Sequence, residues 1–291
     1  MDESCTMAAT PKEARLDWHS AFFIALKAEL VDYLDVLQFE QEHLLNQQPL
    51  RIDAIVIKAP PNVVIKKNIA ESFKGHNIIE YKSPEDSLSI SDYIKVLGYA
   101  CLYQAIESVD YTDITVTMVC TMRPAALLHH LHNETQGRTI VTEKQNGIYV
   151  VSGELFPVQI IESKRLPAQE NAWLKSLKED ADRIALENAL QLNPTVGQKV
   201  NMGAFWHVVA SANTKMIMEV FRMKLSHEQA QEKWAQFFEE IGYTEELEAK
   251  AFDKTLAILR GLRKNIPPAQ LSADMGVPLE RVQRLQQEVF G

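Results

Sequence analysis

Apolar and polar positions follow two different patterns along this chain. Up to about residue 165, short runs rich in β-branched residues alternate with turn residues, which is typical of strands in a sheet. After Pro167, apolar residues recur at spacings of three and four, which is typical of amphipathic helices. The pattern predicts a loose lead-in at 1–14, a mixed α/β domain at 15–165 and an all-helical region at 166–291.

The first part reads as a helix, three strands, a second helix and a fourth strand. Ser83-Pro84 ends the third strand sharply, because the residue before proline disfavours helix. The expected elements are a helix at 18–34, strands at 36–45 and 50–58, a short helix at 66–74, a strand at 77–82, a helix at 91–108 and a strand at 113–121. A short helix from Arg123 and strands near 139–143, 147–152 and 157–162 follow.

The helix expected at 91–108 has a clear start and one unusual residue. Ser89 and Asp92 are capping residues for its first turn. Gly98 lies in its middle, where glycine costs about 1 kcal/mol relative to alanine. We therefore expect Gly98 to pack closely against the sheet.

Three charged residues interrupt the apolar strands. Asp53 lies in the run Arg51-Ile-Asp-Ala-Ile-Val-Ile-Lys58, and Glu80 and Lys82 lie in Asn77-Ile-Ile-Glu-Tyr-Lys82. Residues two apart on a strand share a face, so Glu80 and Lys82 point the same way. An unpaired charge is costly to bury, so charges in such runs indicate either function or a solvated strand end.

The chemistry of these side chains suits phosphodiester cleavage. Mg²⁺ takes oxygen ligands and keeps several waters, so Asp53 and Glu80 would suffice to hold it beside a substrate phosphate. The ion would activate a water molecule, while the Lys82 ammonium could orient that water or stabilise developing charge. The motif predicts a metal site of Asp53 and Glu80 with Lys82 as the catalytic cation.

The order helix, strand, Asp-bearing strand, Glu-x-Lys strand, helix, strand resembles the core of the PD-(D/E)XK nucleases. More narrowly, four stretches are similar to the bacterial family of recombination-promoting nucleases and putative transposases: 51–58, Ile-Lys-Lys-Asn-Ile at 65–69, Asn-Ile-Ile-Glu-Tyr-Lys-Ser-Pro at 77–84 and Asp-Tyr-Ile-Lys-Val-Leu-Gly-Tyr-Ala at 92–100. The resemblance covers roughly residues 17–125. It implies a restriction-endonuclease-like αβββαβ core and Mg²⁺- or Mn²⁺-dependent cleavage of DNA. Ile52 departs from the motif, which has proline before the aspartate.

The same resemblance implies a further acid. Members of the superfamily often supply one from the first helix, and Glu29 matches that position. Glu40 and Glu42, on the expected first strand, are the alternatives. Lys58 and Gln104 are expected to contact the substrate.

The carboxyl end contains a second pattern. Residues 267–285 read as a short helix, a turn at Gly276 and a helix beginning at Pro278, with the spacing of a helix-turn-helix. Arg281 and Arg284 would contact DNA if they face outward. The alternative is a helical hairpin that packs on protein. Four longer helical patterns precede it, at 173–190, 205–218, 229–241 and 245–262.

Composition narrows the function further. The net charge is -9, so DNA binding requires a local basic surface, for which Lys58, Lys66, Lys67, Lys74 and Lys82 are available. His129, His130 and His132 do not share one helical face, so no metal cluster is expected there. No GxGxxG, GxxxxGK[ST] or GxSxG motif occurs, which argues against nucleotide-binding folds and esterases.

The amino terminus and the cysteines indicate the compartment. Three cysteines lack metal-ligand spacing, the chain opens with Met-Asp-Glu-Ser, and no apolar run reaches 18 residues. We expect a cytoplasmic protein without a membrane segment. The leading hypothesis is a DNA endonuclease, associated with a mobile element, for which a homodimer would suit paired cuts in a duplex. The alternative is an inactive nuclease-fold protein that binds nucleic acid or protein.

Overall fold

The computed structural model describes residues 16–41, 54–60, 63–224, 237, 239, 244–264 and 266–290. By its internal contacts the chain divides into two compact units, residues 1–224 and residues 225–291. No helix among the described residues is long and apolar enough to span a membrane.

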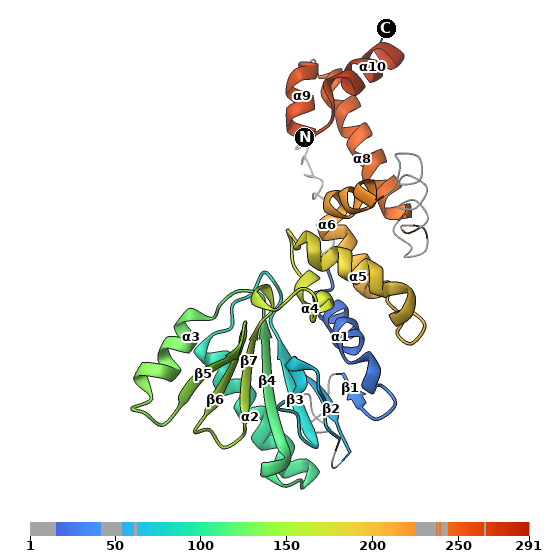
Figure 1. Ribbon diagram of the computed structural model, residues 1–291. Helices are drawn as coiled ribbons and strands as arrows, with labels where there is room; N and C mark the ends of the chain where they lie inside the picture. Colours follow the sequence, from blue (N-terminus) through green and yellow to red (C-terminus); the bar gives the residue numbers. More distant parts are fainter. Residues whose placement is uncertain are drawn as a thin grey trace, which may run out of the picture. The chain divides into compact units, whose positions relative to one another are not determined.

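A seven-stranded mixed sheet forms the centre of the first unit (Figure 1). Its strands lie in the order β1-β2-β3-β4-β7-β6-β5. Their bounds are β1 Gln38–Glu40, β2 Ala54–Lys58, β3 His76–Tyr81, β4 Ile114–Cys120, β5 Ile140–Gln145, β6 Ile148–Ser152 and β7 Val158–Glu162. The three central strands β3, β4 and β7 are parallel, and the other pairs are antiparallel. The carboxyl ends of the central strands therefore meet at one edge of the sheet.

The two faces of the sheet are covered by different helices. Helices α2 (Ile90–Glu107) and α3 (Ala125–His129) share a hydrophobic core with Ile78, Val116 and Ile160. Tyr81 points to the opposite face, where Phe22 of α1 (Trp18–Glu29) stacks on its ring at 4.1 Å. Strands β3, β4 and β7 are buried along almost their whole length, as expected of central strands that are covered on both faces. The mixed α/β architecture expected from the sequence is confirmed.

Helices α4 (Ala172–Ser176), α5 (Arg183–Val196) and α6 (Gly203–Lys224) belong to the same unit as the sheet. Trp173 of α4 meets Phe205 and Trp206 of α6 edge to face, and both helices pack against α1. The division into compact units therefore falls after Lys224, not at the expected boundary near 165. The change of periodicity at 165 marks the change from strands to helices. It is not a domain boundary, because α1, which covers the sheet, also packs against α4 and α6.

The second unit contains α8 (Thr244–Arg263), α9 (Pro268–Met275) and α10 (Leu279–Phe290). Ile258, Leu262, Leu271 and Val282 form its core. Gly276 ends α9 in a left-handed conformation, with φ of 58°, and the Ser272 hydroxyl donates to the carbonyl of Val277. The helical hairpin expected at 267–285 is present as α9 and α10.

Short helices complete the described chain. The 3₁₀ helices are η1 Val31–Tyr33, η2 Asn68–Ala70, η3 Tyr111–Asp113 and η5 Ser163–Arg165, and the segment η4 (His130–Glu134) is a π-helix. The helix expected at 66–74 is thus only the single turn η2. The pattern expected at 173–190 is divided between α4 and α5, and the one at 229–241 falls largely outside the described residues.

Gly98 does not pack on the sheet. It lies on the exposed side of α2, and a Cβ added there would meet no atom within 4 Å. The expectation of close packing at Gly98 is wrong, because the periodicity of α2 places Val96 and Ala100, not Gly98, on the buried side.

Candidate functional site

Glu80 and Lys82 lie together at the carboxyl end of β3. Lys82 Nζ is 3.4 Å from Glu80 Oε1. Glu80 is buried, with 3% of the residue's surface exposed, whereas Lys82 is partly exposed. The backbone N–H of Lys82 still donates to the carbonyl of Val119 on β4, at 2.8 Å, so the strand geometry extends through this residue. The shared face expected from their spacing is therefore observed.

A second carboxylate reaches the same lysine. Lys82 Nζ is 2.8 Å from Asp92 Oδ1, in the first turn of α2. Asp92 also completes a capping box: its Oδ2 accepts from the N–H of Ser89, and the Ser89 hydroxyl accepts from the N–H of Asp92. The start of α2 is thus joined to the end of β3 through one ammonium group.

The electrostatics determine the protonation of this group. Burial works to lower the pKa of Lys82, but the hydrogen bond to Asp92 and the charge of Glu80 outweigh it, and the pKa lies above its usual value. Burial works to raise the pKa of Asp92, but Lys82 and Ser89 together lower it to about 2. At neutral pH Lys82 is a charged donor and Asp92 an anion, so Lys82 cannot act as a general base there.

Asp53, the expected second metal ligand, lies outside the described residues. The first described residue of β2 is Ala54, which pairs with Glu80 in the antiparallel register. Glu42, one of the alternative acids, also lies outside the described residues.

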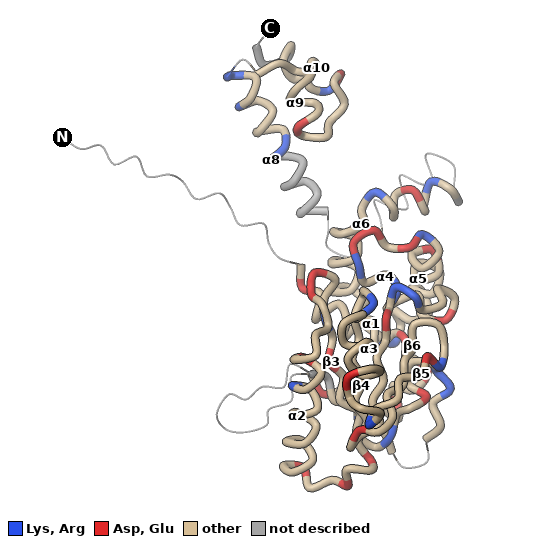
Figure 2. The backbone as a smooth tube through the Cα atoms, turned by 90° about the vertical axis from the view of Figure 1, so that its left-hand side faces the viewer, with Lys and Arg blue, Asp and Glu red and all other residues tan. Residues whose placement is uncertain are grey.

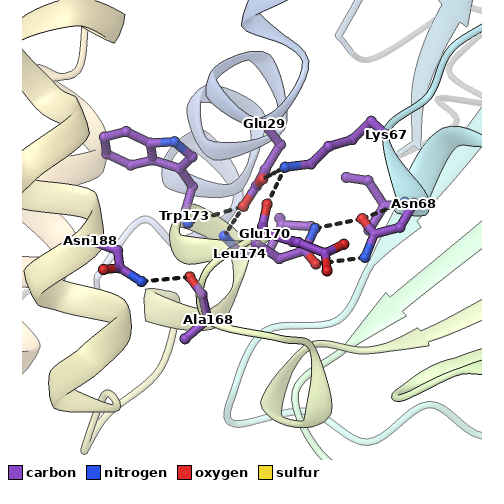
Figure 3. Close-up of polar contacts among 10 residues, drawn as sticks. Glu29, Lys67, Asn68, Ala168, Glu170, Trp173, Leu174 and Asn188 are labelled. Atoms are coloured by element: carbon purple, nitrogen blue, oxygen red, sulfur yellow. Dashed lines mark hydrogen bonds and ion pairs between the residues drawn. The ribbon is translucent and has the colours of Figure 1, made fainter.

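Glu29 is engaged elsewhere (Figure 3). Its Oε1 accepts from the backbone N–H groups of Trp173, at 3.0 Å, and Leu174, at 3.1 Å, while its Oε2 is 2.5 Å from Lys67 Nζ. Desolvation in this fully buried position raises the pKa of Glu29 despite the lysine. The carboxylate therefore supplies the acceptor that the first turn of α4 needs.

Glu29 and Glu80 lie on different faces of the sheet. Helix α1 packs on the face to which Tyr81 points, and adjacent strand residues point to opposite faces. Glu80 instead shares the face of α2 with Asp92. Among the described contacts, none joins Glu29 to the Glu80–Lys82 pair.

Polar side chains around Glu29 extend this structural role. The amides of Asn68 and Asn171 donate to each other, both at 2.9 Å, and Lys67 Nζ donates to the carbonyl of Glu170 (Figure 3). The side-chain amide of Asn188, on α5, donates a hydrogen bond to the carbonyl of Ala168. The network joins α1, η2 and the segment before α4 across the boundary expected at 165.

The expected substrate contacts in the first unit are remote from Glu80. Lys58 pairs with His76 at the other end of β3, about 13 Å from Glu80 at roughly 3.3 Å per residue. Its Nζ is 2.7 Å from Glu40 Oε1. Gln104 lies about 18 Å along α2 from Asp92 at 1.5 Å per residue, and its amide donates to the carbonyl of Val109. Of the alternative acids that are described, Glu40 lies on the Glu80 face, in the row of Val56 and Ile78.

The lysines expected around the site do not form one basic surface. Lys67 pairs with Glu29, Lys58 with Glu40 and Lys82 with Asp92. Lys74 Nζ donates to the carbonyl of Thr112 at 2.5 Å, and Lys66 is exposed. Figure 2 shows both signs of charge interspersed along the first unit. Local pairing, not a continuous patch, uses most of these cations.

Arg281 and Arg284 are both exposed on α10 in the second unit. The core residue Val282 lies between them in sequence, so the two arginines flank the buried side of the helix. Their outward position leaves them available to an anionic partner.

The donor set suits a hard cation only in part. Glu80 supplies carboxylate oxygen, which Mg²⁺ and Mn²⁺ accept. Among the described residues, no group of three or more His, Cys, Asp or Glu side chains could hold a metal ion. Holding one at Glu80 thus depends on a further oxygen ligand, for which Asp53 is the sequence candidate.

Asp92 is the site residue that the sequence interpretation missed. The sequence pattern gives Asp92 only a capping role, although among the described residues it is the acid nearest to Lys82. The available signal was its place in the first turn of the helix that directly follows Glu-x-Lys-Ser-Pro.

Comparison with known proteins does not identify a family for this chain. No family model matches the chain, and no curated protein or solved structure shows significant similarity to it.

Proposed function

We propose that this protein is a metal-dependent DNA endonuclease of the PD-(D/E)XK type. The observation that carries the proposal is the pairing of a buried carboxylate, Glu80, with a partly exposed ammonium, Lys82, at 3.4 Å and at the end of a central strand. Strand ends of this kind place reactive groups where a substrate can reach them.

The order of elements supports the same proposal. The chain runs α1, β1, β2, β3, α2, β4, with the Glu-x-Lys residues at the end of β3 and α2 connecting the parallel strands β3 and β4. This is the helix, strand, strand, strand, helix, strand order that the sequence resemblance implies for the nuclease core.

Each residue has a distinct part in the proposed reaction. Glu80 and Asp53 would hold Mg²⁺ or Mn²⁺, which when bound supplies Lewis-acid polarisation of the phosphate and a nucleophilic water. Lys82, kept protonated, donates a hydrogen bond to the developing negative charge or to the water. Asp92 positions the Lys82 ammonium from the start of α2.

The second unit would contribute DNA contacts. Arg281 and Arg284 are exposed near the beginning of α10, the second helix of the hairpin. In a helix-turn-helix the amino-terminal part of that helix contacts base edges in the major groove.

One observation favours the alternative, an inactive binding module. Lys82 is closer to Asp92 than to Glu80, and this ion pair partly neutralises the charge that catalysis requires. In that case the site would serve to hold α2 against the sheet, and the protein would act through binding alone.

Cleavage of supercoiled plasmid DNA with Mg²⁺ or Mn²⁺ tests the proposal. Wild type is compared with Asp53→Asn, Glu80→Gln and Lys82→Met, and with Glu85→Gln as a matched control on the exposed turn after β3. Loss of one charge-stabilising group should reduce nicking at least about 100-fold. Thermal unfolding of each variant establishes that it is folded.

Two outcomes would overturn the nuclease proposal. Equal nicking by wild type and all three site variants would assign the activity to a contaminant or to another site. No nicking by folded wild type with either metal, combined with retained DNA binding, would favour the binding module.

A further inference from the structure

A hollow of about 400 Å³ opens in the first unit beside α3, separate from Glu80 and Lys82. Its polar lining includes Arg123, His129, His132 and Asn133, and its apolar lining includes Leu128 and Val141. We propose that this hollow binds a phosphomonoester group. Its volume is in the range of small-molecule sites, which are mostly about 300–1,000 Å³.

Arg123 is held in place on the wall of the hollow. Its Nη1 donates to Tyr149 Oη at 2.8 Å, and its guanidinium lies over the Tyr149 ring, 5.4 Å from the centroid. Guanidinium has five N–H donors in a rigid plane, and the described contacts of Arg123 use one of them. The others are available to an anion in a fixed orientation.

The Tyr149 hydroxyl is itself fixed by charged groups. It accepts from Arg165 Nη1 at 2.6 Å and donates to Glu162 Oε2 at 3.0 Å. Because Tyr149 is buried and bonded on both sides, it cannot turn away from Arg123. The wall is therefore built before any ligand arrives, which lowers the entropy cost of binding.

The acid on this wall does not cancel the charge of Arg123. Glu143 Oε1 is 2.9 Å from Arg165 Nη1 and also accepts from the N–H of Gly147. Glu143 and Glu162 therefore both face Arg165 or its tyrosine partner. Besides Glu143 and the Tyr149 hydroxyl, the polar lining consists of a guanidinium, two imidazoles and an amide, which can donate to an anion. His129 Nδ1 also lies 3.4 Å from Glu134 Oε1, so this imidazole has an acidic partner as well.

The π-helix brings part of this lining to the hollow. Helix α3 ends at His129 and continues as the π-helix His130–Glu134, which carries His132 and Asn133. Its end is held by the hydroxyls of Thr135 and Thr139, which both donate to the carbonyl of Leu131. π-helical turns are rare and frequently occur at functional sites.

The geometry suits a phosphomonoester for two reasons. Its terminal oxygens spread in three directions, and the donors come from different segments: Arg123 before α3, His129 in α3 and His132 in the π-helix. Arginine also binds such oxygens in a bidentate manner. Leu128 and Val141 provide an apolar surface for the organic part of the ligand.

The sheet register relates this hollow to the proposed catalytic pair. Glu80, Met118, Ile160 and Tyr149 form one row across β3, β4, β7 and β6. Three inter-strand steps of about 4.8 Å separate Glu80 from Tyr149 by roughly 14 Å on the same face.

The phosphomonoester has two sources: a small organic phosphate or the phosphorylated end of a nucleic-acid strand. The second source rests on the proposed nuclease function, whereas the first does not. Binding is measured without metal and without cleavage, so failure of one proposal is distinguishable from failure of the other.

The probe for the site is phenyl phosphate, with phenol as the ligand lacking phosphate. Calorimetry should give a dissociation constant of about 1 mM or tighter for phenyl phosphate and no heat for phenol. Imidazole resonances of His129 and His132 should shift, while that of His207 on α6 should not. Absence of binding, or shifts confined to His207, would overturn the proposal.

Variants separate the hollow from general surface charge. Arg123→Gln should weaken binding at least about tenfold, since a charge-assisted bidentate contact is lost. His132→Gln, an exposed change, should weaken it by a smaller factor. Arg138→Gln, an exposed arginine on the segment after the π-helix, should leave it unchanged. Equal affinity for wild type, Arg123→Gln and His132→Gln would sink the assignment.

A final comparison distinguishes the two sources. A short oligonucleotide with a 5′-phosphate is measured against the same sequence with a 5′-hydroxyl, using wild type, Glu80→Gln and Arg123→Gln. Tighter binding of the phosphorylated strand, lost in Arg123→Gln, would identify the strand end as the ligand. Equal binding of the two strands, with phenyl phosphate still bound, would identify a small organic phosphate.

Discussion

Lys82 Nζ lies 2.8 Å from Asp92 Oδ1 and 3.4 Å from Glu80 Oε1. The lysine of the Glu-x-Lys pair is therefore held most closely by an acid from the following helix. Asp92 also caps that helix through Ser89. One carboxylate thus connects the start of α2 to the end of β3 and keeps the Lys82 ammonium protonated.

This relationship predicts an acid-dependent loss of stability. The pKa of Asp92 is lowered to about 2 in the folded chain, below its ordinary value of 3.8. Its stabilising effect is therefore fully present above about pH 4 and is lost as pH falls toward 2. Asp92→Asn should lower the free energy of unfolding by about 1 kcal/mol at pH 7. Urea unfolding at several pH values measures this difference.

The exposed Ser91→Ala, in the same turn of α2, is the control and should behave as wild type at every pH. The difference between wild type and Asp92→Asn should shrink between about pH 4 and pH 2. A difference that stays constant down to pH 2 would show that the charge of Asp92 has no part in it.

Replacement of Glu29 should affect folding strongly. Glu29→Ala leaves two backbone N–H groups without their acceptor and removes the buried carboxylate partner of Lys67, and should cost about 3 kcal/mol. Glu29→Gln keeps an oxygen for Trp173 and Leu174 and should cost less. Chemical unfolding measures both, with Glu170→Ala as an exposed control whose side chain is not part of the Glu29 hydrogen bonds.

The pH dependence of Glu29 has the opposite sign to that of Asp92. Burial raises the pKa of Glu29 above its ordinary 4.5, so the folded chain binds this proton more readily than the unfolded chain. Its contribution to stability therefore increases as pH falls from neutral toward 4.5, and Glu29→Gln should lack that increase. If Glu29→Gln abolished DNA nicking with full stability, a catalytic role would be favoured over the structural one.

Gly98→Ala should stabilise the protein. The added Cβ meets no atom, and alanine favours the helix by about 0.5–1 kcal/mol. Gly153→Ala is the contrasting variant, since Gly153 has φ of 96° and its Cβ would collide with the carbonyl of Arg138. In thermal unfolding, the melting temperature of Gly98→Ala should be higher than that of wild type, and the melting temperature of Gly153→Ala should be lower. A destabilised Gly98→Ala would mean that a partner covers this face of α2.

The exposed arginines of α10 should contribute to the salt dependence of DNA affinity. If Arg281 and Arg284 each contact a phosphate, Arg281→Gln and Arg284→Gln should each reduce the slope of log affinity against log salt by about 0.9. Fluorescence anisotropy with a short duplex at several salt concentrations measures the slope. Arg263→Gln, exposed at the end of α8, is the control. An unchanged slope in both variants would support a hairpin that packs on protein.

Local patterns predicted most elements near their observed bounds. The Ser89–Asp92 cap and the stop at Ser83-Pro84 set the limits of α2 and β3 to within about two residues of those expected. The segment at 66–74 did not form the helix that was predicted. Its backbone is held by tertiary contacts instead, such as Gln159, which donates to the carbonyl of Ile69.

The candidate site was predictable only where its members are neighbours in the sequence. Glu80 and Lys82 share a face because they are two residues apart on one strand. Lys58 is expected near the site because it belongs to the adjacent strand, yet the antiparallel register places it opposite His76, at the far end of β3. Without the register, position along a strand does not translate into distance.

The sequence by itself determined the mixed α/β class, the alternation that pairs Glu80 with Lys82, and the helical hairpin around Gly276. These features depend on side-chain period, capping and backbone preference, which act over a few residues. Tertiary structure alone decided that Asp92 forms an ion pair with Lys82 and that Glu29 accepts a hydrogen bond from the backbone N–H of Trp173 in α4. Glu29 and Trp173 are 144 positions apart, and only the packing of α1 against both the sheet and α4 brings a buried carboxylate to those backbone N–H groups.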